Sequence, residues 1–127
     1  MWKAQKQVID FHRKFDCGIG NKLNLENWLF RIDLIKEEVT ETVTAIRNGD
    51  LTGVADGITD SIYVLLGAAV EFGLDIEPLF DEVHRTNMAK IKAATAGGKV
   101  RKPPGWKGPD IAGMLRPYIE AGQGMIK

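Results

Sequence analysis

The stretch LTGVADGITDSIYVLLGAAVEF, residues 51–72, decides the fold of this chain. On a helical wheel it is apolar on nearly every side, which is typical of a helix buried among other helices. Two carboxylates, Asp56 and Asp60, interrupt it one helical turn apart. Like charges at this spacing repel each other and lose hydration on burial, so they need compensation. A hard divalent cation held by carboxylate oxygens is the usual compensation.

A second acidic group precedes this stretch. The spacing of apolar residues predicts an amphipathic helix from Leu25 to about Asn48, with Asn24 as its cap. Its apolar stripe consists of Leu25, Trp28, Ile32, Ile35, Val39, Val43 and Ile46. Leu34 and Ala45 lie on the neighbouring flank and indicate contact with another helix. Three glutamates off the stripe can converge on one point: Glu37, Glu38 and Glu41.

The carboxylates of these two helices predict an all-oxygen cage where the helices face each other. Its members are Glu37, Glu38, Glu41, Asp56 and Asp60. Such a cage is typical of Mg²⁺ or Mn²⁺ rather than of zinc or copper. Two alternatives are a solvated face for the glutamates and a buried acidic cluster with Arg31 or Arg47 as partners.

The remaining sequence also predicts helices. A first helix runs from Trp2 to about Asp16, and its apolar face is Ala4, Val8, Phe11 and Phe15. After Gly73, a helix capped by Asp75 accepts Pro78 in its first turn, where a missing N–H is harmless. Its inner face is Ile76, Leu79, Phe80, Val83 and Asn87.

Glycines and prolines dominate after about Ala94, which indicates a loop or short hairpin. A weak last helix from Ile111 to Ile119 is expected to be interrupted at Pro117. We therefore expect one all-α domain over residues 1–127, a four-helix-core bundle whose loop and tail begin at residue 97. A chain this short cannot cover an all-round apolar helix, so we expect a homodimer or tetramer with its site near a subunit interface.

Composition excludes several classes of protein. Lys and Arg number 17, as do Asp and Glu, so the chain lacks the clustered positive charge that nucleic acid polymers require. The lone Cys17 cannot form an internal disulfide, which fits the cytoplasm. No apolar run reaches the roughly twenty residues that span a bilayer, and no basic-then-apolar leader opens the chain. We expect neither membrane anchoring nor secretion.

Four segments together resemble a known family. They are LIKEEVTE (34–41), VADGITDSIYVLLG (54–67), FDEVHRTNMAKI (80–91) and GKVRKPPGWKGPDI (98–111). In this order they resemble the all-alpha nucleoside triphosphate pyrophosphohydrolases, in the MazG-like, phosphoribosyl-ATP pyrophosphohydrolase-like branch. The resemblance implies a dimeric helical bundle, or a dimer of dimers, that hydrolyses (d)NTPs to the monophosphate and pyrophosphate with Mg²⁺.

The family's motifs map onto the acidic residues. The first, EExxE, falls on Glu37, Glu38 and Glu41. The second, commonly ExxD, matches only through Asp60, because Gly57 stands where its glutamate would be. The resemblance implies that Asp56 supplies this ligand instead. We assign Glu38 as the general base that deprotonates the attacking water, and the other carboxylates as ligands of Mg²⁺, for which Mn²⁺ can substitute.

Candidate substrate-binding residues follow on the fourth helix and the loop. Asn87 would recognise the base or ribose, or else satisfy a helix end, while the nearby Lys90 would meet phosphate. Arg85 points away from both and would reach a neighbouring subunit. Lys102 and Trp106 belong to a basic loop that would fold over the nucleotide; the alternative is a solvated loop with Trp106 anchored to the core.

Other functions remain open at this point. A di-metal carboxylate bundle of the di-iron type needs two carboxylate-x-x-His motifs, and only Asp81 to His84 has that spacing. An HD-type phosphohydrolase needs an adjacent His-Asp pair, which the sequence lacks. A non-catalytic helical dimerisation or regulatory module would leave the acidic cluster incidental.

Overall fold

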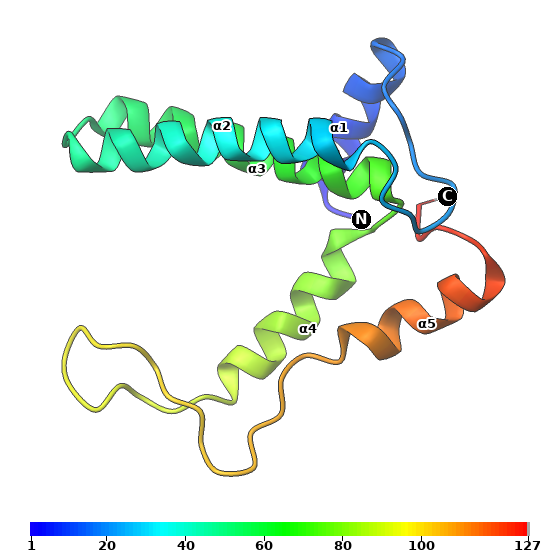
Figure 1. The fold of residues 1–127 in the computed structure, drawn as a ribbon. Coiled ribbons are helices and arrows are strands. Elements are labelled where there is room, and N and C mark those ends of the chain that lie inside the picture. Colours follow the sequence, from blue (N-terminus) through cyan, green and yellow to red (C-terminus); the bar gives the residue numbers. More distant parts are fainter. Residues whose placement is uncertain (127) are drawn as a thin grey trace.

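Residues 1–126, which this computed structural model describes, form helices joined by turns and loops, with no strand among them (Figure 1). The helices are α1 (Lys3–Lys14), α2 (Trp28–Arg47), α3 (Leu51–Phe72), α4 (Ile76–Met88) and α5 (Ile111–Ala121). The predicted all-α class is therefore confirmed. Ile91 and Arg101 form an isolated antiparallel bridge, so the segment after α4 folds back as a short hairpin.

Helices α2 and α3 form a long antiparallel pair, and the bounds of α3 are those predicted from the sequence. Asp50 caps its start by accepting from the Gly53 N–H, at 3.0 Å. Gly73 ends it at φ +80°, in the left-handed conformation that glycine adopts without strain. Gly49, at φ +64°, makes the tight turn that brings the chain back from α2.

The predicted start of α2 is wrong. Asn24 accepts from the Glu26 N–H at 2.9 Å, which closes a local turn instead of capping a helix. The helix begins three residues later than expected, at Trp28, after Asn27 has adopted φ +60°. The short side chain of asparagine tolerates this conformation better than most.

The predicted apolar stripe of α2 does not face α3. The inward face consists of Arg31, Leu34, Glu38, Thr42 and Ala45, all of them buried or partly buried. Most of the stripe is exposed, including Trp28 at 52% and Ile46 at 59%. The predicted flank of Leu34 and Ala45 does face another helix, because α3 presents glycines on its α2-facing side and these allow a close approach.

Burial of α3 is also less complete than predicted. Its C-terminal part is buried from Leu66 to Val70, whereas Asp56 is exposed and Asp60 only partly buried. By length and composition alone this helix is apolar enough to cross a membrane, with a mean hydropathy of 1.3 over its most apolar stretch. The core helix of a water-soluble bundle meets the same test, so that property carries little weight.

Helix α1 crosses α3 near its buried end, and the core lies at this crossing. Val8 and Ile9 pack against Leu66 and Val70 there. The predicted face of α1 is wrong except for Val8. The buried side chains are Gln5, Val8, Ile9 and His12, while Ala4, Phe11 and Phe15 are exposed. The core therefore forms around positions 5, 8, 9 and 12 of α1 rather than around its aromatic residues.

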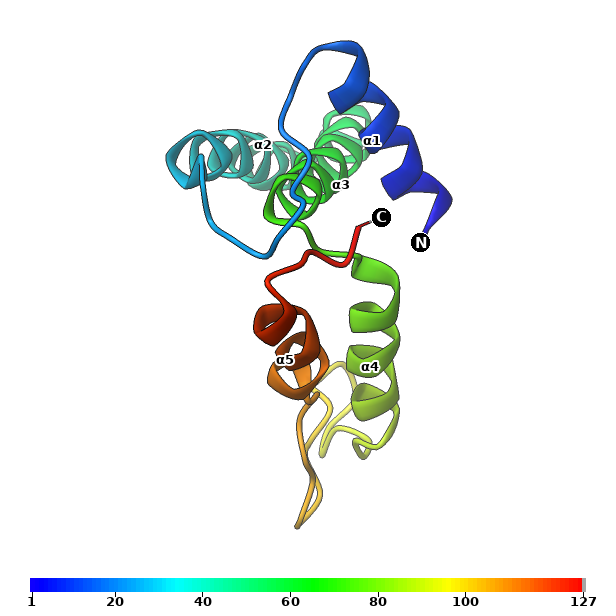
Figure 2. The ribbon, with the colours of Figure 1, turned by 90° about the vertical axis from the view of Figure 1, so that its right-hand side faces the viewer.

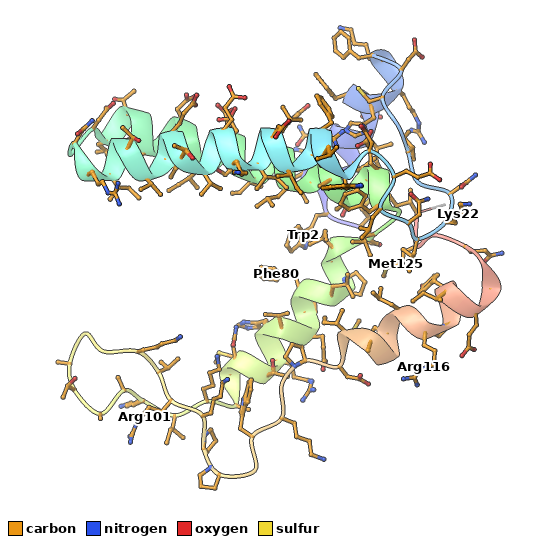
Figure 3. All side chains as sticks on the ribbon, in the orientation of Figure 1. Trp2, Lys22, Phe80, Arg101, Arg116 and Met125 are labelled. Atoms are coloured by element: carbon orange, nitrogen blue, oxygen red, sulfur yellow. The ribbon has the colours of Figure 1, made fainter. Side chains whose placement is uncertain are left out.

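Helices α4 and α5 pack against each other and diverge from the α2–α3 pair (Figures 1 and 2). The tail secures their junction with the core, because the Met125 N–H donates to the Gly73 carbonyl at 2.7 Å. Trp2 and Phe80 meet edge to face across this junction, with ring centroids 4.9 Å apart (Figure 3). Within one chain, therefore, the helices do not form the predicted four-helix core. They form two arms, the α2–α3 pair with α1 and the α4–α5 pair.

The ends of the α4–α5 arm follow the sequence in part. Asp75 caps α4 by accepting from the Glu77 N–H, and Pro78 lies in the first turn, as predicted. The expected break at Pro117 does not occur, because α5 continues through it to Ala121. Asp110 caps the start of this short helix and Gly122 ends it in the left-handed conformation. Both ends are therefore stabilised, although Pro117 removes one backbone hydrogen bond from the interior.

Candidate acidic site at the α2–α3 crossing

Gly57 sets the distance between α2 and α3. A Cβ added at this position would lie 2.9 Å from the Thr42 Cα, so any side chain there would force the helices apart. Thr42 in turn lies 3.3 Å from the Ser61 hydroxyl, oxygen to oxygen. The close approach explains the glycine at the position where the family's second motif has glutamate.

Glu38 occupies the centre of the acidic site. It is partly buried, and its Oε2 is a buried atom with no hydrogen-bond partner among the described residues. Burial raises the pKa of Glu38, and the nearby charges of Glu41, Asp60 and Glu37 raise it further. The two helices therefore bring four of the five predicted carboxylates into one electrostatic cluster.

The fifth carboxylate, Asp56, lies in the adjoining groove. This groove has a volume of about 310 Å³, and Glu41 lines it from α2 while Asp56 and Gly57 line it from α3. As the side chains stand, no three His, Cys, Asp or Glu side chains within residues 1–126 converge tightly enough to hold a metal ion. The backbone brings the carboxylates to one region, but their side chains do not converge on a common point.

The residues present fit a hard divalent cation. The donor set is all oxygen, and the buried Oε2 of Glu38 lacks any partner in the described chain. The arginine alternative is wrong: within residues 1–126, Arg31 pairs with Glu71 and neither Arg31 nor Arg47 forms an ion pair with the cluster. Repulsion in the cluster is therefore left without a protein counter-charge in salt-bridge contact.

The Arg31–Glu71 pair is a buried network that the sequence analysis missed. Burial favours a raised pKa for Glu71, but hydrogen bonds from Arg31 and Asn27 outweigh it and hold the pKa below its usual range. His12 Nε2 lies 3.5 Å from Arg31 Nη2, and His12 Nδ1 lies 2.7 Å from the Gly18 carbonyl oxygen. Helical position could have indicated this pair. Arg31 lies on the same face of its helix as Glu38, and Glu71 lies on the same face as Asp60, so the two charges face each other as the carboxylates do.

Three of the predicted substrate-binding residues lie together at the far end of α4. The Nζ atoms of Lys90 and Lys102 lie 5.1 and 5.0 Å from the Trp106 ring centroid. The Trp106 indole N–H donates to the Thr86 carbonyl at 2.7 Å, which anchors the loop to α4. This basic cluster is on the other arm from the acidic site within one chain (Figure 1).

The other two predicted residues do not join this cluster. Asn87 is exposed, so the expectation of a buried amide is wrong; only part of the inner face, Leu79 above all, is covered. Arg85 forms two hydrogen bonds to the Glu82 carboxylate, at 2.7 and 2.9 Å. Asp81 and His84 are both exposed, away from any pairing of the di-iron kind.

Fold and site together define an all-helical protein with a carboxylate cluster between two antiparallel helices. The sequence model described as phosphoribosyl-ATP pyrophosphohydrolase matches residues 9–87, which is more than half of the chain. The chain belongs to this family, as the resemblance implied. Membership indicates a pyrophosphohydrolase, that is, a hydrolase that acts on phosphoric anhydrides.

A viral protein is also similar over a shorter stretch. The uncharacterized protein L479 of Acanthamoeba polyphaga mimivirus is 40% identical over 47 residues, which make up 37% of this chain and 19% of that protein. The matched part therefore spans about a fifth of the length of that relative.

Proposed function

We propose that the protein hydrolyses a (deoxy)nucleoside triphosphate to the monophosphate and pyrophosphate in a Mg²⁺-dependent reaction, and so controls a nucleotide pool. The observation that carries this proposal is Glu38, a partly buried carboxylate with a raised pKa and an unpartnered oxygen. A general base works best when its pKa lies near the working pH, and crowding by other carboxylates moves Glu38 in that direction.

The reaction breaks the bond between the α-phosphorus and the bridging oxygen. Water attacks the α-phosphorus in line, Glu38 accepts its proton, and pyrophosphate leaves with the bonding electrons. Glu37, Glu41, Asp56 and Asp60 would hold the cation. A bound Mg²⁺ supplies positive charge that offsets the negative charge of the triphosphate and of the departing pyrophosphate, and Mn²⁺ substitutes for it.

The active form in this proposal is a homodimer or tetramer. A folded monomer of 14.1 kDa is expected to expose roughly 6,700 Å². This chain exposes 8966 Å², an excess of about 2,200 Å². Two copies that each cover this excess would bury an area within the range of obligate dimers, about 2,000–5,000 Å² in total.

The surface for this assembly is the exposed stripe of α2, which we call the apolar stripe. Its half-exposed members include Trp28, Ile32, Val39, Val43 and Ile46. Assembly also offers a way to bring the basic cluster of one copy toward the acidic site of another. Lys90 and Lys102 would then meet the phosphates, and Trp106 would cover the nucleotide.

A pyrophosphate-release assay across the canonical (d)NTPs and dUTP, with Mg²⁺ and with Mn²⁺, tests the activity. Chromatography of the products should give the monophosphate and intact pyrophosphate. Accumulation of the diphosphate, or release of orthophosphate step by step, would contradict the proposal.

Thermal melts in EDTA and in excess Mg²⁺ test the cation independently. Binding to the folded state alone raises the melting temperature of the parent. Asp60→Asn removes one carboxylate charge while keeping the shape, so it should gain clearly less from Mg²⁺ and be no less stable in EDTA. Equal gains for the two proteins would show that Asp60 does not take part in cation binding.

A further inference from the structure

An apolar pocket lies where α1 crosses the α2–α3 pair, and neither the proposed chemistry nor the core accounts for it. Its volume is about 380 Å³, within the roughly 300–1,000 Å³ of typical ligand pockets. Aromatic rings from all three helices line it: Phe11, Phe15, Phe30 and Tyr63. Each of these side chains is between 39% and 57% exposed, so the rings face the pocket without filling it.

The rings already contact one another around the pocket. Phe11 lies 4.7 Å from Phe15 and meets Tyr63 edge to face at 5.6 Å, centroid to centroid. Phe30 faces them from α2, next to Leu34. Half-exposed aromatic side chains gathered at one hollow are costly in water, and a flat ligand that stacks between them removes this cost.

The pocket adjoins the acidic site along the same two helices. Its border residues Leu34 and Tyr63 are four and three residues from Glu38 and Asp60, respectively. One helical turn, roughly 5 Å along the axis, therefore separates the aromatic walls from the carboxylates. Phe30 and Leu34 also share a side of α2 with Glu37 and Glu41, because their spacings are three or four residues.

We infer that this pocket binds the base of the substrate while the acidic site holds the triphosphate, an inference that rests on the proposed function. A nucleotide has the matching layout, since a single sugar separates its flat aromatic base from its charged phosphates. Aromatic side chains stack on any base, so the walls supply affinity rather than selectivity.

The floor of the pocket supplies the selectivity. His12 and Arg31 form it, at 2% and 5% exposed. The Gly18 carbonyl can only accept, so His12 Nδ1 carries the proton and its Nε2 turns a lone pair toward Arg31. Arg31 gives its Nε–H to Glu71, and no hydrogen bond within residues 1–126 engages its Nη1.

Nη1 of Arg31 therefore lies at the pocket floor with no hydrogen-bond acceptor from the described part of the chain. A Cβ at Gly67 would lie 2.6 Å from it, so glycine at this position leaves room for the guanidinium. A donor selects a base that presents a carbonyl oxygen at its inner edge. The pocket therefore binds a base with a ring carbonyl, such as guanine, uracil or thymine, in preference to adenine, whose ring acceptors N1 and N7 lie beside an amino group that repels a cationic donor.

Titration of the intact protein with GMP, UMP and AMP in EDTA, followed by NMR or calorimetry, tests the pocket without any hydrolysis. GMP or UMP should bind at least tenfold more tightly than AMP. Phe30→Leu keeps an apolar side chain but removes the stacking surface, so it should weaken binding by roughly tenfold or more. Phe80→Leu is the matched control, since Phe80 is 52% exposed against 51% for Phe30 and lies outside the pocket.

The outcomes separate this inference from the proposed function. Binding that is lost in Phe30→Leu alone supports the base pocket even where no triphosphate is hydrolysed. If the parent hydrolyses a triphosphate and Phe30→Leu has the same KM as the parent and Phe80→Leu, the base pocket is wrong and the proposed function stands. Tighter AMP binding overturns the assigned class of base. Dissociation of an oligomer by Phe30→Leu, with nucleotide affinity unchanged, would assign the pocket to a subunit contact and overturn the inference.

Discussion

The α2–α3 pair and the α4–α5 arm are built on different principles. Along α2 and α3, small residues allow close helix packing, and the polar groups that remain between the helices form the acidic cluster. The α4–α5 arm depends on single polar links instead. Trp106 donates to the Thr86 carbonyl, and Glu82 accepts from Arg85 and from the Asp110 N–H.

This difference assigns separate tasks to the two regions. A change in the α2–α3 pair should alter chemistry or helix packing, because side chains there are fixed by many neighbours. A change in the α4–α5 arm should loosen it locally and leave the chemical step nearly intact.

Glu38→Gln removes the proposed base and should reduce turnover by about 10²–10⁴-fold. Because the pKa of Glu38 is raised in the folded protein, its ionisation costs stability as pH rises above the usual range for glutamate. The variant should therefore melt no lower than the parent at neutral pH without Mg²⁺. Pyrophosphate release and thermal melts measure both effects. Glu120→Gln, on the exposed surface of α5, is the control and should keep normal turnover. Near-normal turnover in Glu38→Gln would show that Glu38 is not the general base.

Ile32→Glu combined with Val39→Glu places charge on the apolar stripe and should convert the oligomer into monomers. Like charges that face each other across a subunit contact cannot be hydrated there, so association is lost. Light scattering at micromolar concentration measures the mass. Asp33→Lys, an exposed position on the same helix about 100° around the axis from Ile32, should leave the mass unchanged. A parent that is already monomeric would contradict the assembly.

Gly57→Ala tests the close helix crossing, and the sign of its effect is diagnostic. In an exposed helix this change stabilises by up to about 1 kcal/mol. Here the new Cβ would meet Thr42, so the free energy of unfolding should fall instead by roughly 1–3 kcal/mol. Urea unfolding measures the change. A more stable variant would show that α2 and α3 have room to spare.

Acid should loosen the α4–α5 arm locally. The hydrogen bond from Arg85, aided by the Asp110 N–H, lowers the pKa of Glu82 from 4.5 to about 2. A lowered carboxyl pKa gives stability that is complete above pH 4.5 and is lost as pH falls toward 2. Amide exchange at Asp110 should rise within this window. Glu82→Gln should abolish the pH dependence; an unchanged profile would exclude Glu82 as its origin.

The sequence predicted helix ends well where a single cap or glycine determines them. Asp50 and Gly73 bound α3 because a cap and a left-handed glycine act within one turn. Asn24 misled because an asparagine that closes a turn and one that caps a helix look alike in sequence. Pro117 misled because a short helix capped at both ends can tolerate one missing N–H.

Tertiary arrangement was predicted less well, since a wheel shows faces but not neighbours. On α2 the wheel separated the apolar stripe from the flank of Leu34 and Ala45 that meets α3, but on α1 it placed Phe11 and Phe15 in the core although both are exposed. Helical spacing placed Glu38 and Glu41 on one side of α2, and the charges of Glu41 and of Asp60 on α3 both act on Glu38. The ion pair of Arg31 and Glu71 was missed, since a charged residue on a buried face is rare enough to be overlooked.

The tight turn at Gly49 has a consequence for the order of folding. Contacts between the adjoining ends of α2 and α3 span few residues, so little loop entropy opposes them and this helical hairpin can form early. In the proposed oligomer, the apolar stripe stays exposed after this step until a second copy binds. Refolding should accordingly contain a slower phase whose rate increases with protein concentration. In dilute solution, the folded but unassembled monomer should persist and be prone to aggregation.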